Sequence, residues 1–402
     1  MKKTVKMAFA LAVSALFVAC GAEKQEWLYQ LENVNELGLS NGYTYTIPDV
    51  PDGNYTVEVV IGSKEQAGVT SVRGESRRLF LENIPTNKGE FKTFTFNVNK
   101  RDTIISEGNV VRIKPREKTK LNWDSNLTLE ITGSNPTVEK ISVRKADDDV
   151  ITVFLCGDST TVDQDTDPWA SWGQMLPRFL DEKVSVANYG ESGESSNSFI
   201  FEKRLEKLMT QIKAGDYIFV VFGHNDEKQT GPEGGAFKHF TKFMQVYIDS
   251  AFSVGAHPVL LTPTQRRNFD ENGKIVCSHG DFPEAAKQLA AKNNIPIIDL
   301  TTMTTAMYEA LGVEGSKNAL VHYPANTFTD QPRPMADNTH FNMYGAYQVA
   351  KCVIQGIRDL NIPLKENIRK DYTATYDPSN PDKFEDFEWT WTTVELTKPD
   401  GD

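Results

Sequence analysis

Five short apolar runs punctuate the second part of this chain, and they constrain its fold more than any other feature. The runs occupy residues 151–157, 184–189, 217–223, 257–263 and 295–300. Intervening segments such as 199–212 and 282–294 carry apolar residues at helical spacing. Strands that are apolar on both faces and alternate with helices are typical of a parallel sheet covered on both sides. The pattern therefore predicts an α/β fold, a flavodoxin-like three-layer α/β/α sandwich with a five-stranded parallel sheet.

The first part of the chain follows a different pattern, in which apolar and polar side chains alternate with a period of two. Residues 54–62, 94–98 and 127–131 show this alternation, and Pro-Asp-Gly and Asn-Lys-Gly sequences supply turns between them. We expect an antiparallel β-sandwich or jelly-roll domain over residues 20–147. A charged break at 145–149 separates it from the α/β part.

The α/β part is predicted to span residues 150–362 and to carry the chemistry of the protein. A polar and aromatic tail follows at 363–402, and we expect it to pack back on the domains. Its Trp389 and Trp391 could form a platform for a sugar ring, but packing against either domain is the interpretation we favour.

The first residues have the character of an export signal. A lysine-rich start precedes an apolar run at 7–19 that is too short to span a bilayer as a helix. The run ends in small residues followed by Cys20, a sequence that resembles a bacterial lipobox. We therefore expect a lipoprotein signal peptide over 1–19, lipidation of Cys20, and a secreted or outer-membrane/periplasmic location in a bacterium. Simple secretion and an uncleaved anchor are the alternatives.

Charge and cysteine content narrow the range of partners. A net charge of −12 argues against nucleic acid, because a phosphate backbone requires a basic surface, and it also disfavours adhesion to anionic membranes. Membrane contact is therefore expected only through the lipid anchor. Beyond Cys20, the chain has Cys156, Cys277 and Cys352, whose number and spacing fit neither a disulfide framework nor a zinc site. We expect no structural metal.

Polar residues follow the first three predicted strands, at the edge of the sheet where open parallel sheets bind ligands. Ser159 follows the first strand near the start of the next helix, where backbone N–H groups stabilise negative charge. Gly193 lies in a Gly/Ser-rich loop after the second strand, where a glycine allows close backbone approach. Asn225 follows the third strand and could direct its amide at an oxyanion. Taken one at a time, each is equally compatible with an ordinary turn or loop.

A fourth polar group, Asp337 and His340, lies just before the last helical stretch at 344–357. The two residues are three positions apart, which is close enough for the carboxylate to orient the imidazole. His340 would then take the proton of Ser159 as a general base, a role worth roughly 10²–10⁴-fold in rate. Helix capping by a short polar loop is the alternative.

Together and in this order, the four polar segments resemble the four sequence blocks of the SGNH (GDSL-type) hydrolases. The blocks are GDS at 157–159, the glycine loop at 188–199, GHND at 223–226 and DNTH at 337–340. The resemblance covers about residues 150–362, and within the family the chain is similar to the rhamnogalacturonan acetylesterases. The first part of the chain resembles the galactose-binding-like module attached to some of these esterases.

The resemblance implies an SGNH hydrolase fold and ester hydrolysis through an acyl-enzyme, with no cofactor. It assigns Ser159 as the nucleophile, His340 as the general base and Asp337 as the acid that orients it. The oxyanion hole would consist of the backbone N–H groups of Ser159 and Gly193 and the side-chain amide of Asn225.

The sequence departs from its relatives directly after the oxyanion glycine. Glu194 stands where relatives commonly carry Arg, and an acidic side chain there is expected to repel a galacturonate carboxylate and so to influence substrate choice. His279, Arg266 and Arg267 are further candidate substrate contacts. Structural or surface roles are equally open for these three.

The sequence thus predicts a carbohydrate O-acetyl esterase that acts on an acetylated plant polysaccharide such as pectic rhamnogalacturonan. An SGNH esterase or lipase for other acyl esters is the alternative within the same class. A catalytically inactive, glycan-binding surface lipoprotein is the alternative from another class.

Overall fold

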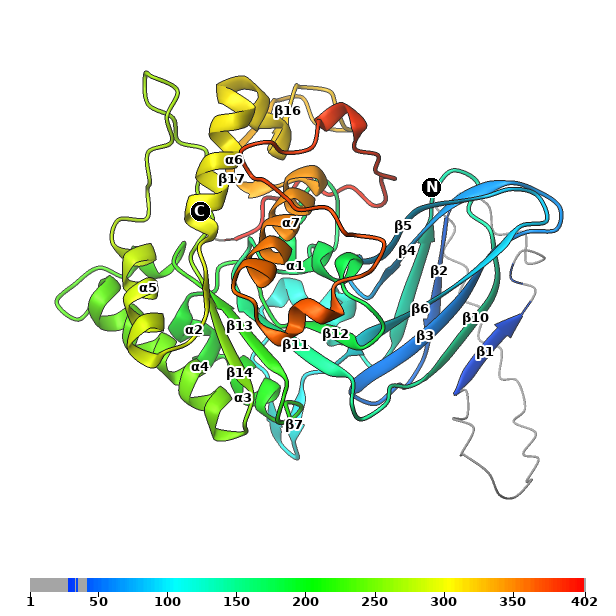
Figure 1. Cartoon of the computed structure of the whole chain (residues 1–402), viewed down its shortest axis with the longest axis horizontal. Helices are drawn as coiled ribbons and strands as arrows, with labels where there is room; N and C mark the ends of the chain where they lie inside the picture. Colours follow the sequence, from blue (N-terminus) through cyan, green and yellow to red (C-terminus); the bar gives the residue numbers. More distant parts are fainter. Residues whose placement is uncertain (1–27, 33, 35–41, 401–402) are drawn as a thin grey trace.

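The computed structural model describes residues 28–32, 34 and 42–400. The predicted signal peptide at 1–19 and Cys20 lie outside the described residues. Within the described part, no helix is both long and apolar enough to cross a bilayer. Figure 1 shows an α/β part and a β-rich part that meet along neighbouring strands.

Five parallel strands form the centre of the α/β part. Their order is β12 (Val184–Asn188), β11 (Ile151–Gly157), β13 (Tyr217–Val221), β14 (His257–Leu261) and β15 (Ile297–Ile298). Each neighbouring pair is parallel. Every strand lies within one of the apolar runs of the sequence, because a strand packed on both faces has no polar side.

Helices cover both faces of these strands. The first group is α1 (Trp172–Met175), α6 (Leu300–Gly315) and α7 (Met343–Asp359); the second is α2 (Ser196–Phe201), α3 (Arg204–Met209), α4 (Thr241–Ser253) and α5 (Phe282–Asn293). Alternate residues of β11 serve the two faces: Val153 and Leu155 pack with the first group, and Phe154 packs with the second. The helix expected over 199–212 is divided into α2 and α3, because Lys203 adopts a left-handed conformation with φ of 65°.

The sheet continues beyond β12 into the first part of the chain. β6 (Phe91–Lys100) pairs with β12 in parallel, and β3 (Gly53–Gly62), β10 (Val138–Lys145) and β1 (Tyr29–Glu32) follow as antiparallel strands. The result is one mixed sheet of nine strands. It differs from the expected sheet of five, because the edge of β12 finds a backbone partner in Asn97 and Val98 of β6.

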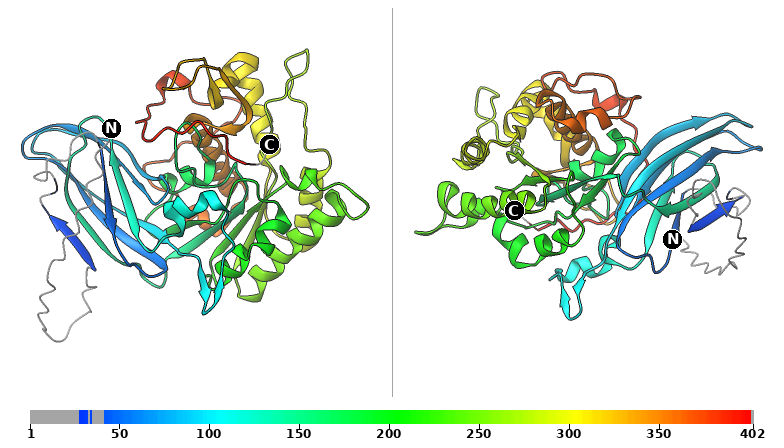
Figure 2. Two further views of the ribbon diagram at one scale, coloured as in Figure 1. Left: turned by 180° about the vertical axis from the view of Figure 1, so that it is seen from behind. Right: turned by 60° about the horizontal axis from the view of Figure 1, so that its bottom comes forward.

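A second antiparallel sheet completes a β-sandwich in the first part. Its strands are β2 (Tyr43–Ile47), β9 (Leu127–Thr132), β4 (Gly68–Gly74) and β5 (Arg78–Thr86). Val57 and Val59 of β3 share a buried core with Leu129 and Ile131 of β9. The two sheets therefore pack face to face, as the views in Figure 2 show.

Between β6 and β9 the chain leaves the sandwich and reaches the α/β part. This excursion contains the hairpin of β7 (Ile104–Ser106) and β8 (Asn109–Val110) and two 3₁₀ turns, η2 (Pro115–Thr119) and η3 (Leu121–Trp123). Trp123 joins the core beneath α2–α5. Glu117 is fully buried and pairs with Arg204 of α3 at 2.6 Å. Residues of the first part are thereby fixed beside the loop that follows β12.

After the 3₁₀ turn η8 (Pro363–Asn367), the described part of the tail lies against both parts of the molecule and extends to Asp400 (Figure 1, orange to red). It includes one further turn, η9 (Phe384–Asp386). The guanidinium of Arg73 lies 3.8 Å from the ring centre of Trp389, so this indole packs against the sandwich. Trp391 is 44% exposed and contacts the rings of Tyr323 and Phe328.

A buried carboxyl in the sandwich makes stability depend on pH. Glu75 is fully enclosed between β4 and β5, and burial raises its pKa from near 4.5 to about 8, although Arg78 and a hydrogen bond from the Thr128 N–H oppose the shift. Because the folded state holds this proton more tightly than the unfolded chain, stability should be highest below pH 4.5 for this group and should fall as pH rises toward 8. We expect Glu75→Gln to remove that fall, a difference of about 4 kcal/mol at pH 8.

Thermal denaturation between pH 5 and pH 8 checks this expectation. The matched control is Glu65→Gln, which changes a carboxylate that is 85% exposed. If the thermal stabilities of Glu75→Gln and the wild-type protein changed with pH in the same way, the raised pKa of Glu75 would be contradicted.

Candidate active site

The turn after β11 places Ser159 at the carboxyl end of the central strand. Asp158 is fully buried and accepts hydrogen bonds from the backbone N–H and the hydroxyl of Thr160, at 2.9 and 2.8 Å. The Ser159 carbonyl in turn accepts a hydrogen bond from the hydroxyl of Ser171 at 2.7 Å. These bonds hold the turn, so Asp158 acts as a support for its neighbour.

Ser159, His340 and Asp337 form a continuous line of hydrogen bonds. His340 Nε2 lies 2.9 Å from Ser159 Oγ, and His340 Nδ1 lies 2.8 Å from Asp337 Oδ2. Both Asp337 and His340 lie on β17 (Met335–Phe341), which pairs with β16 (Leu320–Tyr323), where the sequence suggested a loop. The arrangement has the geometry of a nucleophile, a general base and an orienting acid.

The carboxylate of Asp337 is held in its ionised form. Burial alone would raise its pKa, but His340 and the backbone N–H groups of His340 and Thr339 donate to it and hold the pKa well below its usual range. An ionised carboxylate at this position can fix the orientation of the imidazole and can stabilise an imidazolium on His340.

The turn or loop after each of β11, β12 and β13 carries one candidate hydrogen-bond donor for an oxyanion. Among the described residues, neither the Ser159 N–H nor the Gly193 N–H donates to a protein acceptor. Gly193 adopts φ of 78°, a conformation that favours glycine. Asn225 donates one of its two amide N–H groups to the carbonyl of Glu194, at 2.9 Å, which fixes it beside the glycine loop. Its second N–H can donate to an oxyanion.

Asp226 ties the loop after β13 to the start of α2. Its carboxylate accepts from the backbone N–H of Ser196, at 3.0 and 3.2 Å, and from the Ser196 hydroxyl. Burial raises its pKa to about 6 in spite of these bonds. Asp226 therefore positions Asn225 and the glycine loop relative to each other.

Glu194 does not face a substrate, which corrects the expectation drawn from the sequence. Its side chain is fully buried, and Oε1 lies 2.5 Å from Lys114 Nζ and 3.8 Å from Arg204 Nε. Oε2 accepts a hydrogen bond from the hydroxyl of Ser198 at 2.6 Å. The side chain is neutralised by cations that are distant in sequence, so it has no free charge with which to repel a galacturonate.

His279 and Arg266 are likewise held by the protein. Both ring nitrogens of the buried His279 are engaged, with Glu227 at 3.0 Å and with the Thr264 carbonyl at 2.9 Å. Arg266 pairs with Glu227 at 2.6 Å and donates to Ser278 at 3.0 Å. Both therefore brace the loops around the site and do not offer free contacts to a substrate.

Arg267 braces the strand that carries the acid and base. Its guanidinium donates to Ser316 Oγ at 3.0 Å and to Asn338 Oδ1 at 3.3 Å, and its backbone N–H donates to the Asn338 carbonyl. Asn338 follows Asp337 on β17. The role that fits Arg267 is support of β17.

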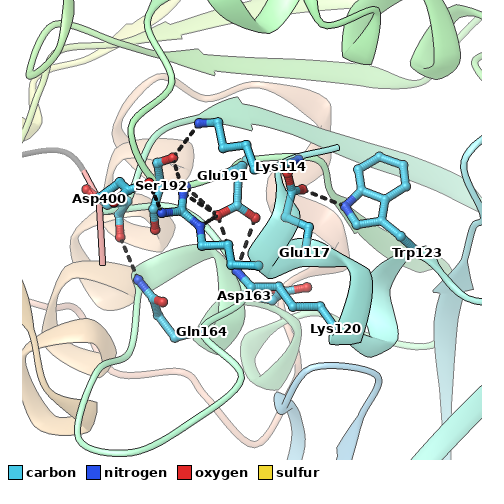
Figure 3. Close-up of polar contacts among 12 residues, drawn as sticks. Lys114, Glu117, Lys120, Trp123, Asp163, Gln164, Glu191, Ser192 and Asp400 are labelled. Carbon is cyan, nitrogen blue, oxygen red and sulfur yellow. Dashed lines mark hydrogen bonds and ion pairs between the residues drawn. The ribbon is translucent and has the colours of Figure 1, made fainter. Parts of the chain in front are cut away.

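Sequence reasoning missed a group of cations that the excursion from the sandwich brings to the glycine loop. Lys114, Arg116 and Lys120 reach Glu191 and Ser192, as Figure 3 shows for the labelled residues. The signal was present as a basic run in an otherwise acidic chain. The sequence did not show that this run lies at the site, because the run belongs to the β-rich part and only the folded chain brings it next to the glycine loop.

Comparison with known proteins identifies the family to which the chain belongs. Residues 153–353 match the family described as GDSL-like Lipase/Acylhydrolase, and the matched range includes Ser159, Gly193, Asn225, Asp337 and His340. The chain belongs to this family. This GDSL-like hydrolase is accordingly a serine carboxylic ester hydrolase.

Two relatives from Bacillus subtilis cover similar lengths of the GDSL-like hydrolase. The rhamnogalacturonan acetylesterase RhgT is 43% identical over 220 residues, which is 54% of this chain and 94% of the relative. The probable rhamnogalacturonan acetylesterase YesY is 34% identical over 222 residues, 54% of this chain and 98% of the relative. The crystal structure of the B. subtilis protein YxiM covers 80% of this chain and 81% of its own, with 25% identity and a TM-score of 0.48.

Proposed function

We propose that this GDSL-like hydrolase is a carbohydrate O-acetyl esterase that removes acetyl groups from an acetylated plant polysaccharide of the rhamnogalacturonan or pectin type. The observation that carries the proposal is the hydrogen-bonded line from Asp337 through His340 to Ser159. The two relatives named as rhamnogalacturonan acetylesterases support the choice of substrate class.

In the proposed reaction, Ser159 Oγ attacks the carbonyl carbon of the acetyl ester while its proton passes to His340 Nε2. The carbonyl oxygen becomes an oxyanion that the N–H groups of Ser159, Gly193 and Asn225 stabilise. The bond between the acyl carbon and the sugar oxygen then breaks, and His340 returns the proton to that oxygen. Water, activated by His340, attacks the acetyl-serine and releases acetate.

The other assignments complete this proposal. The β-sandwich acts as a galactose-binding-like jelly-roll module attached to the catalytic part, and lipidation of Cys20 anchors the mature enzyme outside the inner membrane of a bacterium. The half-exposed Trp391, beside Tyr323 and Phe328, is an aromatic surface on which a sugar ring can stack.

Acetate release from acetylated rhamnogalacturonan and acetylated xylan tests the proposal, with nitrophenyl esters of increasing chain length as a second assay. We expect release from the pectic polymer to exceed release from xylan, and we expect acetate to be the preferred nitrophenyl ester. A preference for chains longer than butyrate would favour an esterase for other acyl groups. Binding of the polymer without turnover would favour a glycan-binding surface protein.

A further inference from the structure

The last described residues of the C-terminal tail lie over the glycine loop at Gly193. A Cβ placed on Gly193 would lie 3.3 Å from Cβ of Asp400 and 3.4 Å from Nζ of Lys114. Two residues earlier in the tail, Lys398 Nζ lies 3.7 Å from Asp337 Oδ2. The last residues described therefore run across the site, from the orienting acid to the oxyanion glycine.

Arg116 contacts Asp400, the last described residue of this tail. Its guanidinium forms an ion pair with the carboxylate of Asp400, and its Nη2 also lies 2.6 Å from the Ser192 carbonyl and 3.1 Å from Glu191 Oε1. The side chain of Arg116 is 29% exposed and that of Asp400 is 70% exposed. One edge of the guanidinium is thus anchored on the protein, while another holds a carboxylate that solvent reaches and that a competing anion can replace.

Glu191, whose carboxylate contacts Arg116, is held in its ionised form. Burial disfavours the ionised form of Glu191, but Lys120, Arg204 and Arg116 outweigh it and lower the pKa of Glu191 to about 2. Lys120 Nζ lies 3.1 Å from Glu191 Oε2. Glu191 therefore stays ionised at any pH at which the enzyme works, and it holds Arg116 in place whether or not Asp400 is bound.

Lys114 adds a second cation on the same side of the loop. Its ammonium donates to the Ser192 carbonyl at 2.7 Å and pairs with Glu194. Figure 3 shows Lys114, Ser192, Glu191 and Asp400 gathered around this point. Both cations come from the excursion of the β-rich part, so this part of the chain contributes directly to the edge of the catalytic site.

We propose that Arg116, flanked by Lys114, is a binding site for a uronate carboxylate of the substrate, and that Asp400 occupies this site until the substrate displaces it. The inference rests on the proposed function and names the charged group of the polysaccharide that the enzyme selects. In a hexuronate the carboxylate and the ring hydroxyls that carry acetyl esters belong to one sugar ring. An acetyl group at the Gly193 N–H therefore leaves a carboxylate of the same or the next sugar near Arg116, whose planar fork of donors suits it.

The test compares acetylated rhamnogalacturonan that has free carboxylates with the same polymer after methyl esterification of its carboxyl groups. For the wild-type enzyme, we expect kcat/KM for acetate release to be about tenfold higher on the free acid, because a charge-assisted bond is lost on the methyl ester. Arg116→Gln should bring this ratio near one, and Arg116→Lys should retain part of it. The ratio is informative because any loosening of the glycine loop affects both polymers alike.

Asp400→Asn tests whether the carboxylate of Asp400 competes with the substrate carboxylate for Arg116. We expect this variant to lower KM for the free acid by about threefold and to leave KM for the methyl ester unchanged, because only the charged substrate competes for Arg116. The matched control is Arg144→Gln, which removes a partly buried arginine whose hydrogen-bond partners, Asp147 and the Lys145 carbonyl, are close in sequence. This control should keep the wild-type ratio of kcat/KM between the free-acid polymer and the methyl-esterified polymer.

The outcomes separate the two proposals. Equal rates on the two polymers for the wild-type enzyme, or a full ratio in Arg116→Gln, would overturn the carboxylate site while leaving the esterase assignment intact. An unchanged KM in Asp400→Asn would overturn the occupation of the site by the tail. Absence of acetate release from both polymers would instead contradict the proposed function itself.

Discussion

Ser159→Ala and His340→Ala should each lower kcat for ester hydrolysis by at least about 10⁴-fold, and combining them should cause little further loss. The reason is that the two residues act as one unit: without the imidazole the hydroxyl has no base, and without the hydroxyl the imidazole has no proton to take. Hydrolysis of nitrophenyl acetate by the two single variants and the double variant measures the effect.

His322→Ala is the matched control for the histidine. His322 lies on β16, next to the strand of His340, and its Nε2 lies 2.9 Å from Asn338 Oδ1. This variant should stay within a few-fold of wild-type activity, because His322 supports β17 through Asn338 and bonds neither Ser159 nor Asp337. Losses in the single variants that multiply in the double variant would show that the two side chains act independently, and the proposed mechanism would then be wrong.

Asn225→Ala should lower kcat by about 10²–10³-fold, equivalent to about 2.7–4 kcal/mol, and should change KM much less. The amide N–H that does not bond to Glu194 donates to the oxygen of the ester only as negative charge develops on it. Its loss therefore weakens the transition state more than the bound substrate. Steady-state kinetics on nitrophenyl acetate and on acetylated polymer should show the same loss.

Because Asn225 also fixes the Glu194 carbonyl, the loss must be separated from a displaced loop. Asn197→Ala provides the comparison, since Asn197 Oδ1 accepts hydrogen bonds from Gln229 and Ser195 close to the same loop. It should remain within a few-fold of wild-type kcat. A large rise in KM for Asn225→Ala with kcat unchanged would indicate a substrate-binding role in place of oxyanion stabilisation.

The strands and the layers of the α/β part follow from local pattern. The runs that became β11 and β13 are apolar on both faces, and only burial between two helical layers satisfies such strands. The pairing of β6 with β12 was not predictable in this way. Asn97 and Ser185 meet across this pair, yet nothing in either segment specifies a partner so far away in the chain.

The same distinction between local pattern and long-range contacts applies to the predicted site. Ser159 and Asn225 could be placed because they directly follow strands whose ends meet at one edge of the sheet. The environment of Glu194 could not be predicted, because its partners, Lys114 and Arg204, come from the β-rich part and from α3. Local sequence pattern is enough to place a residue at the carboxyl edge of the sheet. Whether its charge is neutralised depends on ion pairs with residues that are distant in the sequence.

The nine-stranded sheet also determines how the β-sandwich is placed relative to the catalytic part when the enzyme binds a polymer. A binding module on a flexible linker raises the local concentration of substrate but leaves the spacing between module and catalytic site open. Here the backbone bonds between β6 and β12 fix that spacing. If the β-sandwich binds glycan as proposed, a glycan held by both parts would lose an acetyl group only where that group lies at a fixed distance from the bound end.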